Sequence, residues 1–475
     1  MSRSGRWLRR LGTTSVVLVL LAAVAAYQFD LGSRWFGLAT PSPVTEPALV
    51  APPPGLDLPA AAARTPVARP ARAGEAARAS VRRALAGLVS DRDLGRRVAV
   101  AVSQLSDGAV VYRRGVDEFI PASTLKLLTA ASVLQSLGPD HRFATTVVSG
   151  RRAERIVLVG GGDPFLERVP VTDGSTYPHR VDLGTLAGAT ARALRKADRT
   201  AVRLGFDASL FTGPAASPAW EPNYVPDDVV SRVSALWTNQ GREKSGEVLA
   251  KPGAEAARQF AVALGRRGIT VLGTPTPARA PRGSRQLAAV WSAPLAQIVQ
   301  RTLEVSDNEA AEVLFRHVAL ATGRPGSFAA ATTAVADVLG RLGVDLGRSR
   351  IADGSGLSRE NRLSPQVLLS VLAVAADDEH PELRRVVTGL PAAGFNGSLT
   401  YRFETGAKQG LGRVRAKTGT LSGVHGLAGV VTGRDGTPLG FVAIADKVKL
   451  ADTLDARAVI DEIAAALAAC SCGTT

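Results

Sequence analysis

The chain has only two cysteines among its 475 residues, Cys470 and Cys472, both near the carboxyl end. So few cysteines give no disulfide framework and no zinc site; we expect an idle tail there, with a local or intermolecular disulfide as the alternative. None of the five histidines lies in a His-Glu-x-x-His pattern, and no Gly-x-Ser-x-Gly elbow occurs. These absences disfavour a zinc peptidase and a Ser-His-Asp esterase, and we expect neither a metal nor a cofactor.

Acidic residues are outnumbered, with 42 Asp and Glu against 57 Lys and Arg, a net charge of +15. Residues 1–83 hold +7 of that charge. No basic run with interleaved aromatic residues, helix-turn-helix pattern or zinc-knuckle spacing accompanies it, so we do not expect a nucleic-acid partner. We expect attraction to anionic lipid headgroups or to an anionic wall polymer instead.

An uncharged stretch, residues 11–29, follows four arginines and ends at Asp30. Its 19 residues can just span a bilayer, and Ala23-Val24-Ala25 offers a cleavage site, so residues 1–36 are predicted to be a membrane anchor or a cleaved signal. We favour the anchor because aromatic residues typical of a membrane interface follow the stretch. In either case the body is expected to be exported, at the extracytoplasmic face of the cell membrane or in the cell wall.

Residues 37–74 are predicted to be a linker. Nine of the 28 prolines fall in this segment, between Pro41 and Pro70, with Ala, Thr and Ser among them and no helical or strand period. Such a composition is typical of a semi-extended spacer, which here would separate the folded body from the membrane.

A serine precedes a lysine by three positions at only one place. Of the eight lysines, Lys126 alone has a serine three residues before it, Ser123, at the start of an apolar helical run. Positions three apart are neighbours on a helix, so a neutral Lys126 amine could accept the proton of the Ser123 hydroxyl. The alternative is an ordinary helix start, with Ser123 as N-cap and Lys126 as a solvated charge.

Two further short patterns are equally rare. Among the five asparagines only Asn308 has a serine two residues before it, Ser306, and among the lysines only Lys417 is followed by Thr-Gly. The patterns Ser-x-x-Lys, Ser-Asp-Asn and Lys-Thr-Gly therefore follow one another along the chain, once each. In this order they resemble the motifs of the penicillin-recognising serine enzymes, which comprise penicillin-binding proteins and serine β-lactamases.

The spacing of these patterns narrows the resemblance. Ser123 and Ser306 are 183 residues apart, far more than a compact serine β-lactamase leaves between these motifs, while Asn308 and Lys417 are 109 apart. An inserted region before Ser-Asp-Asn is similar to that of the D-alanyl-D-alanine carboxypeptidase/endopeptidase family, the class C low-molecular-mass penicillin-binding proteins. The resemblance covers most of residues 81–469.

The resemblance implies an α+β fold of the β-lactamase/transpeptidase kind, an antiparallel sheet flanked by helices plus a helical lobe that holds Ser123. We expect residues 75–143 and 290–475 to form this catalytic domain. Alternation of apolar residues predicts hairpins near residues 98–112 and 424–445, and helices are predicted near 76–90 and over 453–469. Short strands alternate with helical patterns over 144–289, which predicts an inserted α/β region.

Acyl transfer needs a nucleophile, a base, an oxyanion site and a proton path. We assign Ser123 as nucleophile, Lys126 as base, Ser306 as proton relay to the leaving D-alanine, and Asn308 as partner of the substrate amide and of Lys126. Burial and the positive charge of Lys417 are together expected to lower the pKa of Lys126. Lys417 is also expected to bind the terminal carboxylate of the substrate.

Further substrate contacts are expected from a strand edge and two loops. Thr418, Gly419 and Thr420 would line an edge on which an extended peptide can lie, and the amides of Ser123 and Thr420 would form the oxyanion hole. The resemblance makes Asp163, in Gly-Asp-Pro, a candidate for binding the amino group of a stem diamino acid; the alternative is a simple turn.

The loop that contains Arg359, Asp353-Gly354-Ser355-Gly356-Leu357-Ser358-Arg359, also looks like a segment of the family. Arg359 could bind a substrate carboxylate, and the alternative is a surface arginine. A glycine-rich stretch, Gly160-Gly161-Gly162, is not expected to bind a nucleotide, because it lacks a Gly-Lys-Ser/Thr ending and no helix pattern follows it.

The resemblance therefore implies a serine D-Ala-D-Ala carboxypeptidase, with D,D-endopeptidase cleavage as a second activity, that trims peptidoglycan stem peptides through an acyl-enzyme on Ser123. It also implies covalent inhibition by β-lactams. The alternative is a β-lactamase that uses the same acyl-enzyme. That activity requires fast deacylation, and the sequence offers no recognisable additional base for the water.

Overall fold

The computed structural model describes residues 76–152, 154–171 and 176–473. The predicted anchor or signal (1–36) and the predicted linker (37–74) lie outside these residues. Within the described ranges, no helix has the length and apolar character needed to cross a bilayer.

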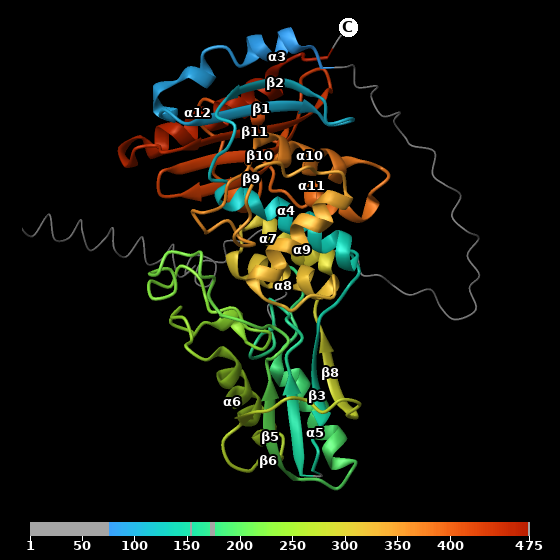
Figure 1. The fold of residues 1–475 in the computed structure, drawn as a ribbon. Coiled ribbons are helices and arrows are strands. Elements are labelled where there is room, and N and C mark those ends of the chain that lie inside the picture. The colour runs from blue at the N-terminus through green and yellow to red at the C-terminus, as the bar shows by residue number, and fades with distance from the viewer. Residues whose placement is uncertain (1–75, 153, 172–175, 474–475) are drawn as a thin grey trace, which may run out of the picture. The chain divides into compact units, whose positions relative to one another are not determined.

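The first sheet has five antiparallel strands in the order β2-β1-β11-β10-β9 (Figure 1). Strands from the two ends of the described chain meet in it, because β1 pairs with β11. Both hairpins predicted from the sequence are confirmed, as is the antiparallel sheet itself. The strands are β1 (Val98–Gln104), β2 (Val110–Gly115), β9 (Val414–Leu421), β10 (Val424–Thr432) and β11 (Pro438–Asp446).

Each face of this sheet is covered by helices, because successive strand residues point to opposite sides. In β1, Val100 and Val102 belong to a core with α3 (Arg78–Ala84) and α12 (Thr453–Ala469), while Ala99 and Ala101 belong to the core of the helical lobe. The span of α12 is as predicted. The first helix is shorter than predicted, because Gly87 leaves the helical region at φ 88°, and the 3₁₀ turns η1 (Leu88–Ser90) and η2 (Arg92–Leu94) follow.

The helical lobe is built around one buried helix, α4, in which every residue from Lys126 to Leu134 is buried. Ser364 caps α10 and Pro365 is its first residue, as the sequence predicts. The lobe comprises the 3₁₀ turn η3 (Ala122–Leu125) and the helices α4 (Lys126–Leu137), α7 (Leu295–Glu304), α8 (Asn308–Ala321), α9 (Phe328–Arg341), α10 (Pro365–Ala376) and α11 (Arg385–Thr388).

A second sheet lies between the first two motifs in sequence and has its own hydrophobic core. Its order is β6-β5-β4-β3-β8, with β7 paired to β5; β4 is parallel to β5, and β3 is antiparallel to both of its neighbours. Two helices pack on it, so the α/β character predicted for this region is observed. The elements are β3 (Ala144–Ser149), β4 (Arg155–Val159), α5 (Leu183–Arg195), β5 (Ala201–Asp207), α6 (Pro252–Gly265), β6 (Thr270–Val271), β7 (Thr276–Pro277) and β8 (Gln286–Trp291).

The carboxyl-terminal cysteines are not an idle tail, so that expectation is wrong. Cys470 and Cys472 form a disulfide with each other, and Cys472 is fully buried in the core under α12. The Ala77 N–H donates to the Cys472 carbonyl at 2.6 Å, which ties this end to the segment that precedes α3. The apolar surroundings of Cys472 and this main-chain hydrogen bond explain why the carboxyl-terminal segment packs on the first sheet and its helices.

Candidate active site

Ser123 lies in η3, the single 3₁₀ turn that leads into α4. The preceding residue, Ala122, is fully buried and has φ 46°, in the left-handed region that residues other than glycine rarely adopt. Thr124 fixes the turn, because its hydroxyl donates to the Pro121 carbonyl at 2.7 Å. The turn ends at Leu125, and Lys126 begins the buried helix α4.

Lys126 is almost fully buried, with 1% of its surface exposed, and its ammonium makes three hydrogen bonds. It donates to Ser123 Oγ at 2.8 Å, to Asn308 Oδ1 at 2.7 Å and to the Ser355 carbonyl at 2.8 Å. The contact between Lys126 and Ser123 that the spacing predicts is therefore confirmed, and the solvated-lysine alternative is wrong. Asn308, 182 residues further along the chain, is brought into the same cluster.

The third acceptor, the Ser355 carbonyl, belongs to a loop pressed against η3. Gly356 has φ 84°, and a Cβ there would lie 1.9 Å from the Ala122 carbonyl oxygen, so only glycine fits. Buried Glu312 of α8 holds this loop, because its two carboxylate oxygens accept the N–H groups of Gly354 at 2.9 Å and Ser355 at 2.8 Å. Glu312 thereby positions a carbonyl that binds Lys126.

Burial lowers the pKa of Lys126 to about 8, because the ammonium has lost its water. The carboxylates of Glu312 and Asp353, both fully buried nearby, act in the opposite direction and raise it. Burial in turn raises the pKa of Glu312 to about 8, with the negative charge of Asp353 as the second cause. A lysine with a pKa near 8 is partly neutral at neutral pH and can act as a base.

Lys417 lies on β9 and is fully buried. Among the described residues, its ammonium donates only to the adjacent Thr418, to the carbonyl at 3.0 Å and to Oγ1 at 3.3 Å. Burial lowers its pKa well below the usual value, and the charge of Lys126 lowers it further. We expected burial and the charge of Lys417 to lower the pKa of Lys126 together; burial is the main cause, and the carboxylates around Lys126 offset part of its effect.

The strand that carries Lys-Thr-Gly is the edge strand of the first sheet. A Cβ on Gly419 would lie 2.9 Å from the Pro121 carbonyl oxygen, so β9 passes directly beside η3. The Thr418 hydroxyl donates to Ser398 Oγ at 3.1 Å. Among the described residues, only β10 forms main-chain hydrogen bonds with residues 417–420, so this part of the edge can pair with a peptide.

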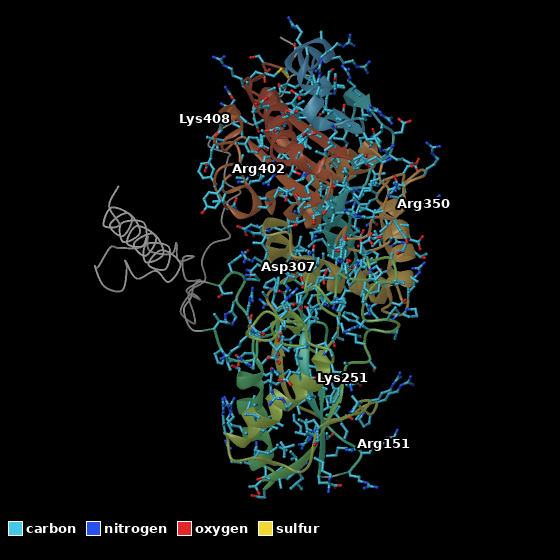
Figure 2. The ribbon with its side chains drawn as sticks, turned by 90° about the vertical axis from the view of Figure 1, so that its left-hand side faces the viewer. Arg151, Lys251, Asp307, Arg350, Arg402 and Lys408 are labelled. Atoms are coloured by element: carbon cyan, nitrogen blue, oxygen red, sulfur yellow. A yellow bond between two sulfur atoms is a disulfide. The ribbon has the colours of Figure 1, made fainter. Side chains whose placement is uncertain are left out.

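The Ser-Asp-Asn motif forms the turn between α7 and α8, and Figure 2 labels its middle residue, Asp307. Ser306 adopts φ 62°, and the Asp307 carboxylate caps α8 by accepting the Ala310 N–H at 2.8 Å. Gln240 donates to both Asp307 oxygens at 2.9 Å. This capping places Asn308 at the first position of α8, where its side chain reaches Lys126.

Asp163 is nearly buried, 3% exposed, in the loop after β4. Its carboxylate accepts the Phe165 N–H at 2.9 Å, which is the local turn that the alternative reading expected. Burial raises its pKa to about 7. The loop packs on α8 through His317, whose Nε2 lies 3.0 Å from the Gly162 carbonyl oxygen, but Asp163 forms no hydrogen bond to the Ser123 cluster among the described residues.

Arg359 is placed beside the end of β9. Its guanidinium donates to the Ser422 carbonyl at 2.8 Å and lies 3.8 Å from the Glu221 carboxylate, with about a third of the side chain exposed (34%). It therefore is neither a free surface arginine nor a member of the hydrogen-bonded Ser123 cluster.

The sequence indicated no role for four residues of the site, although two of them, Asp353 and Ser355, lie in the loop that resembles the family. The four are Glu312, Asp353, Ser355 and Ser398. Asp353 is fully buried and accepts four hydrogen bonds, from Trp220, Gly356, Ser358 and Asn361, so it holds the same loop as Glu312. Ser355 acts through its carbonyl, which every residue has, so no residue type could have marked it. Glu312 follows Asn308 by four positions, one helical turn, and that spacing was the one available signal.

A protein-family model described as "D-Ala-D-Ala carboxypeptidase 3 (S13) family" matches residues 81–253 and 242–467. Among characterised relatives, Carboxypeptidase Rv3627c of Mycobacterium tuberculosis is 36% identical over 405 residues, which cover 83% of this chain and 85% of the relative. The D-alanyl-D-alanine carboxypeptidase of Actinomadura sp. (strain R39) is 29% identical over 409 residues, 71% of this chain and 75% of that protein.

Among solved structures, penicillin binding protein 4 (dacB) from Haemophilus influenzae superposes with a TM-score of 0.66 at 23% identity. The match covers 80% of this chain and 97% of that structure. A likeness of this size supports the fold expected from the motifs, including the region inserted between the first two of them.

Proposed function

Because the chain belongs to the D-Ala-D-Ala carboxypeptidase 3 (S13) family, we propose that it releases the terminal D-alanine of peptidoglycan stem peptides through an acyl-enzyme on Ser123. One observation carries the assignment of residues: the Lys126 Nζ lies 2.8 Å from Ser123 Oγ and 2.7 Å from Asn308 Oδ1. A nucleophile, a base of lowered pKa and an amide that orients it are thus in direct contact.

Acylation begins when Ser123 Oγ attacks the carbonyl carbon of the penultimate D-alanine. Its proton passes to neutral Lys126, which the Ser355 carbonyl and Asn308 hold in line with the hydroxyl. The developing oxyanion would be bound by the main-chain N–H groups of Ser123 and Thr420. The close approach of β9 to η3 at Gly419 supports this assignment.

The substrate would lie along the open edge of β9, at Thr418, Gly419 and Thr420. Its terminal carboxylate would bind the Lys417 ammonium and the Thr418 hydroxyl. This assignment is supported by the lack of any carboxylate partner for Lys417 among the described residues. A bound carboxylate would raise the pKa of Lys417 again and so favour the charged form that holds it.

The leaving amine needs a proton, and we propose that the Ser306 hydroxyl relays it from Lys126. The C–N bond then breaks, D-alanine leaves, and the acyl group remains as an ester on Ser123. Water attacks that ester, Lys126 accepts the water proton and returns a proton to Ser123 Oγ, and the shortened stem is released. A cross-linked stem whose D-alanyl carbonyl enters the same site would be cleaved likewise, which is the D,D-endopeptidase reaction.

Two outer contacts complete the proposed substrate site. Asp163 would bind the ammonium group of a stem diamino acid, since a buried carboxylate with one hydrogen bond can accept another. Arg359 would bind a further carboxylate of the stem with the part of its guanidinium that the Ser422 carbonyl leaves free.

An enzyme of peptidoglycan acts outside the cytoplasm. We propose that residues 11–29 anchor it to the membrane, that 37–74 act as a spacer, and that 75–143 with 290–475 form the catalytic domain into which 144–289 are inserted. A solved structure of the Haemophilus influenzae protein is complexed with a β-lactam, at 24% identity and a TM-score of 0.60. We propose that β-lactams likewise acylate Ser123 in this chain.

The test is to follow three substrates with the purified full chain: a pentapeptide stem, a cross-linked stem dimer and penicillin. We expect release of D-alanine from the first, cleavage of the second, and slow turnover of the third after stoichiometric acylation. Rapid hydrolysis of penicillin with no conversion of either stem would contradict the proposal in favour of a β-lactamase.

A further inference from the structure

Positive charge outside the amino-terminal 83 residues is concentrated in residues 144–289. This region has 20 Lys and Arg against 13 Asp and Glu, whereas residues 84–143 and 290–475 together have 26 against 25. Figure 2 labels two of its cations, Arg151 and Lys251. The catalytic part is therefore nearly neutral, and the surplus charge belongs to the region of the second sheet.

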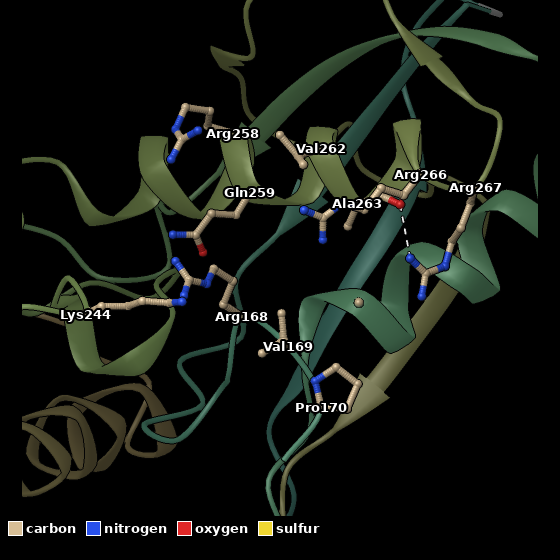
Figure 3. A pocket seen from close by; sticks show the side chains of 11 residues that line it. Arg168, Val169, Pro170, Lys244, Arg258, Gln259, Val262, Ala263, Arg266 and Arg267 are labelled. Carbon is tan, nitrogen blue, oxygen red and sulfur yellow. Dashed lines mark hydrogen bonds between the residues drawn. The ribbon is translucent and has the colours of Figure 1, made fainter. Parts of the chain in front are cut away.

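A cavity of about 520 Å³ in this region is lined by five basic residues (Figure 3). All five lie between the Ser-x-x-Lys and Ser-Asp-Asn motifs in sequence. Among the residues that the structure describes, no acidic residue lines the cavity. The wall is formed by the segment after β4, the first turn of α5 and the length of α6. The cations, which we call the basic cavity residues, are Arg168, Lys244, Arg258, Arg266 and Arg267.

Among the described residues, most of these cations form no hydrogen-bonded ion pair. The Glu255 carboxylate also acts on Arg168 through space, and Glu243 acts on Arg258. Arg258 is paired with Glu255, but Arg168, Lys244 and Arg266 form no side-chain hydrogen bond or ion pair within the described ranges. Figure 3 shows Arg168 and Lys244 at one end of the cavity and Arg266 further along α6.

Arg267 is held in place on the cavity wall. Its Nη1 donates to the Ala263 carbonyl at 3.1 Å. This bond orients the guanidinium but does not neutralise its charge. The Arg267 guanidinium also packs against α5 at Gly188, where an added Cβ would lie 3.0 Å from its Nε. The glycine at this position makes room for the guanidinium.

The chemistry of the wall points to a phosphate group attached to carbon. Guanidinium groups match the oxygens of phosphate in pairs, and several cations around one space exceed what a single carboxylate would neutralise. Between them lie two exposed apolar side chains, Val169 (51% exposed) and Val262 (46% exposed), which can contact the carbons of a sugar or polyol. A flat bilayer would meet only the rim of such a concave site.

We propose that this cavity binds phosphodiester groups of an anionic wall polymer and so retains the enzyme beside its substrate. The choice of a wall polymer rests on the proposed action on peptidoglycan; the anion site itself does not.

A second cavity of about 560 Å³ in the same region also gathers cations. Its lining residues Arg155 and Val157 alternate along β4 with Ile156 and Leu158, which face the core under α5 and α6, so it lies on the other face of the second sheet. Among the described residues, Glu154 is its only acidic lining residue. Its basic lining residues are Arg151, Arg152, Arg155, Arg203 and Arg279.

The test compares two doubly charge-reversed variants of the full chain. Lys244→Glu with Arg266→Glu alters exposed basic cavity residues. The matched control, Arg341→Glu with Lys408→Glu, makes the same net charge change at exposed side chains that line neither cavity. Binding of poly(glycerol phosphate) is measured at several salt concentrations, with polygalacturonate as carboxylate polymer and phosphatidylglycerol vesicles as lipid surface.

We expect the wild type and the control to bind poly(glycerol phosphate) within about twofold of each other, and the cavity variant to bind at least about tenfold more weakly, since two charged contacts are reversed. Equal losses in both variants, equal binding of polygalacturonate, or binding to the vesicles but not to the polymer would each overturn the proposal. Acylation by penicillin, measured in parallel, reports on the proposed function separately and should be the same in all three proteins.

Discussion

Two buried lysines interact in the active site, and their surroundings differ. Lys126 donates to three acceptors and lies near the carboxylates of Glu312 and Asp353, whereas Lys417 donates only to Thr418 among the described residues. Burial lowers the pKa of both lysines, and within the described ranges carboxylates offset this effect at Lys126 but not at Lys417. This difference supports the proposed roles, in which Lys126 exchanges a proton near neutral pH and Lys417 binds the substrate carboxylate.

Replacing each lysine by arginine should give the largest difference between the two sites. Lys126→Arg should lower the acylation rate by at least about a thousandfold, because guanidinium does not lose its proton in this range. Lys417→Arg should lower the acylation rate far less, because a positive charge that can bind the substrate carboxylate remains. Stopped-flow acylation by a chromogenic β-lactam measures both. Similar losses in the two variants would mean that Lys126 does not act as the base.

Removing the charge of Lys417 should weaken substrate binding. In Lys417→Met, which keeps most of the volume, the KM for a stem pentapeptide should rise about 10- to 100-fold, the value of a lost charged hydrogen bond. The control is a stem whose terminal carboxyl is amidated, for which wild type and variant should differ little. An equal effect on both stems would show that Lys417 does not bind that carboxylate.

The same variant should also shift the pH profile. Because acylation requires neutral Lys126, its rate should rise with pH up to the pKa of about 8 and then level off. Repulsion between two ammonium groups acts on both, so removal of Lys417 should raise the pKa of Lys126 and move this limb to higher pH. The shift should be smaller than the depression that burial causes, and an unmoved limb would remove Lys417 from the control of that pKa.

A smaller effect is expected at Glu312, which holds the loop beside Lys126. In Glu312→Gln the amide can accept only one of the two main-chain N–H groups, so the Ser355 carbonyl should be held less firmly and acylation should slow about tenfold. Loss of the carboxylate should lower the pKa of Lys126 and move the limb to lower pH, opposite to Lys417→Met. Slower acylation with an unchanged profile would indicate a purely structural role.

The smallest effect is expected at Asp163. Asp163→Asn should raise KM about fivefold to tenfold for a stem that carries a free side-chain ammonium, and should leave a stem with that group acetylated unchanged. Because burial raises the pKa of Asp163 to about 7, the preference for the ammonium stem should grow as pH rises through that value. A preference that is independent of pH, or retained in the variant, would exclude Asp163.

The sequence predicts the contact of Ser123 with Lys126 well, because it depends on a spacing of three. That spacing holds even though the turn is 3₁₀, where residues three apart lie directly above one another. The two hairpins and α12 were likewise predictable from short-range patterns. By contrast, Asn308 reaches Lys126 across 182 residues of chain, and only a resemblance of motifs indicated that contact.

The loop that completes the site could not be predicted, because Lys126 contacts it through a main-chain carbonyl, and the carboxylates of Glu312 and Asp353 that hold it act through contacts made only in the folded chain. The carbonyl of Ser355 is a main-chain acceptor, and its place is set by the close approach of Gly356 to Ala122. The disulfide of Cys470 with Cys472 was left as an alternative, since nothing local shows that Cys472 enters a core assembled from both ends of the chain.

The most direct test of the central claim is peptide mass spectrometry of the full chain after brief treatment with penicillin, for the wild type and for Ser123→Ala. The account predicts one penicilloyl group per wild-type molecule, on the peptide that contains Ser123, and none on the variant. An adduct on any other peptide, or equal labelling of the variant, would contradict Ser123 as the nucleophile.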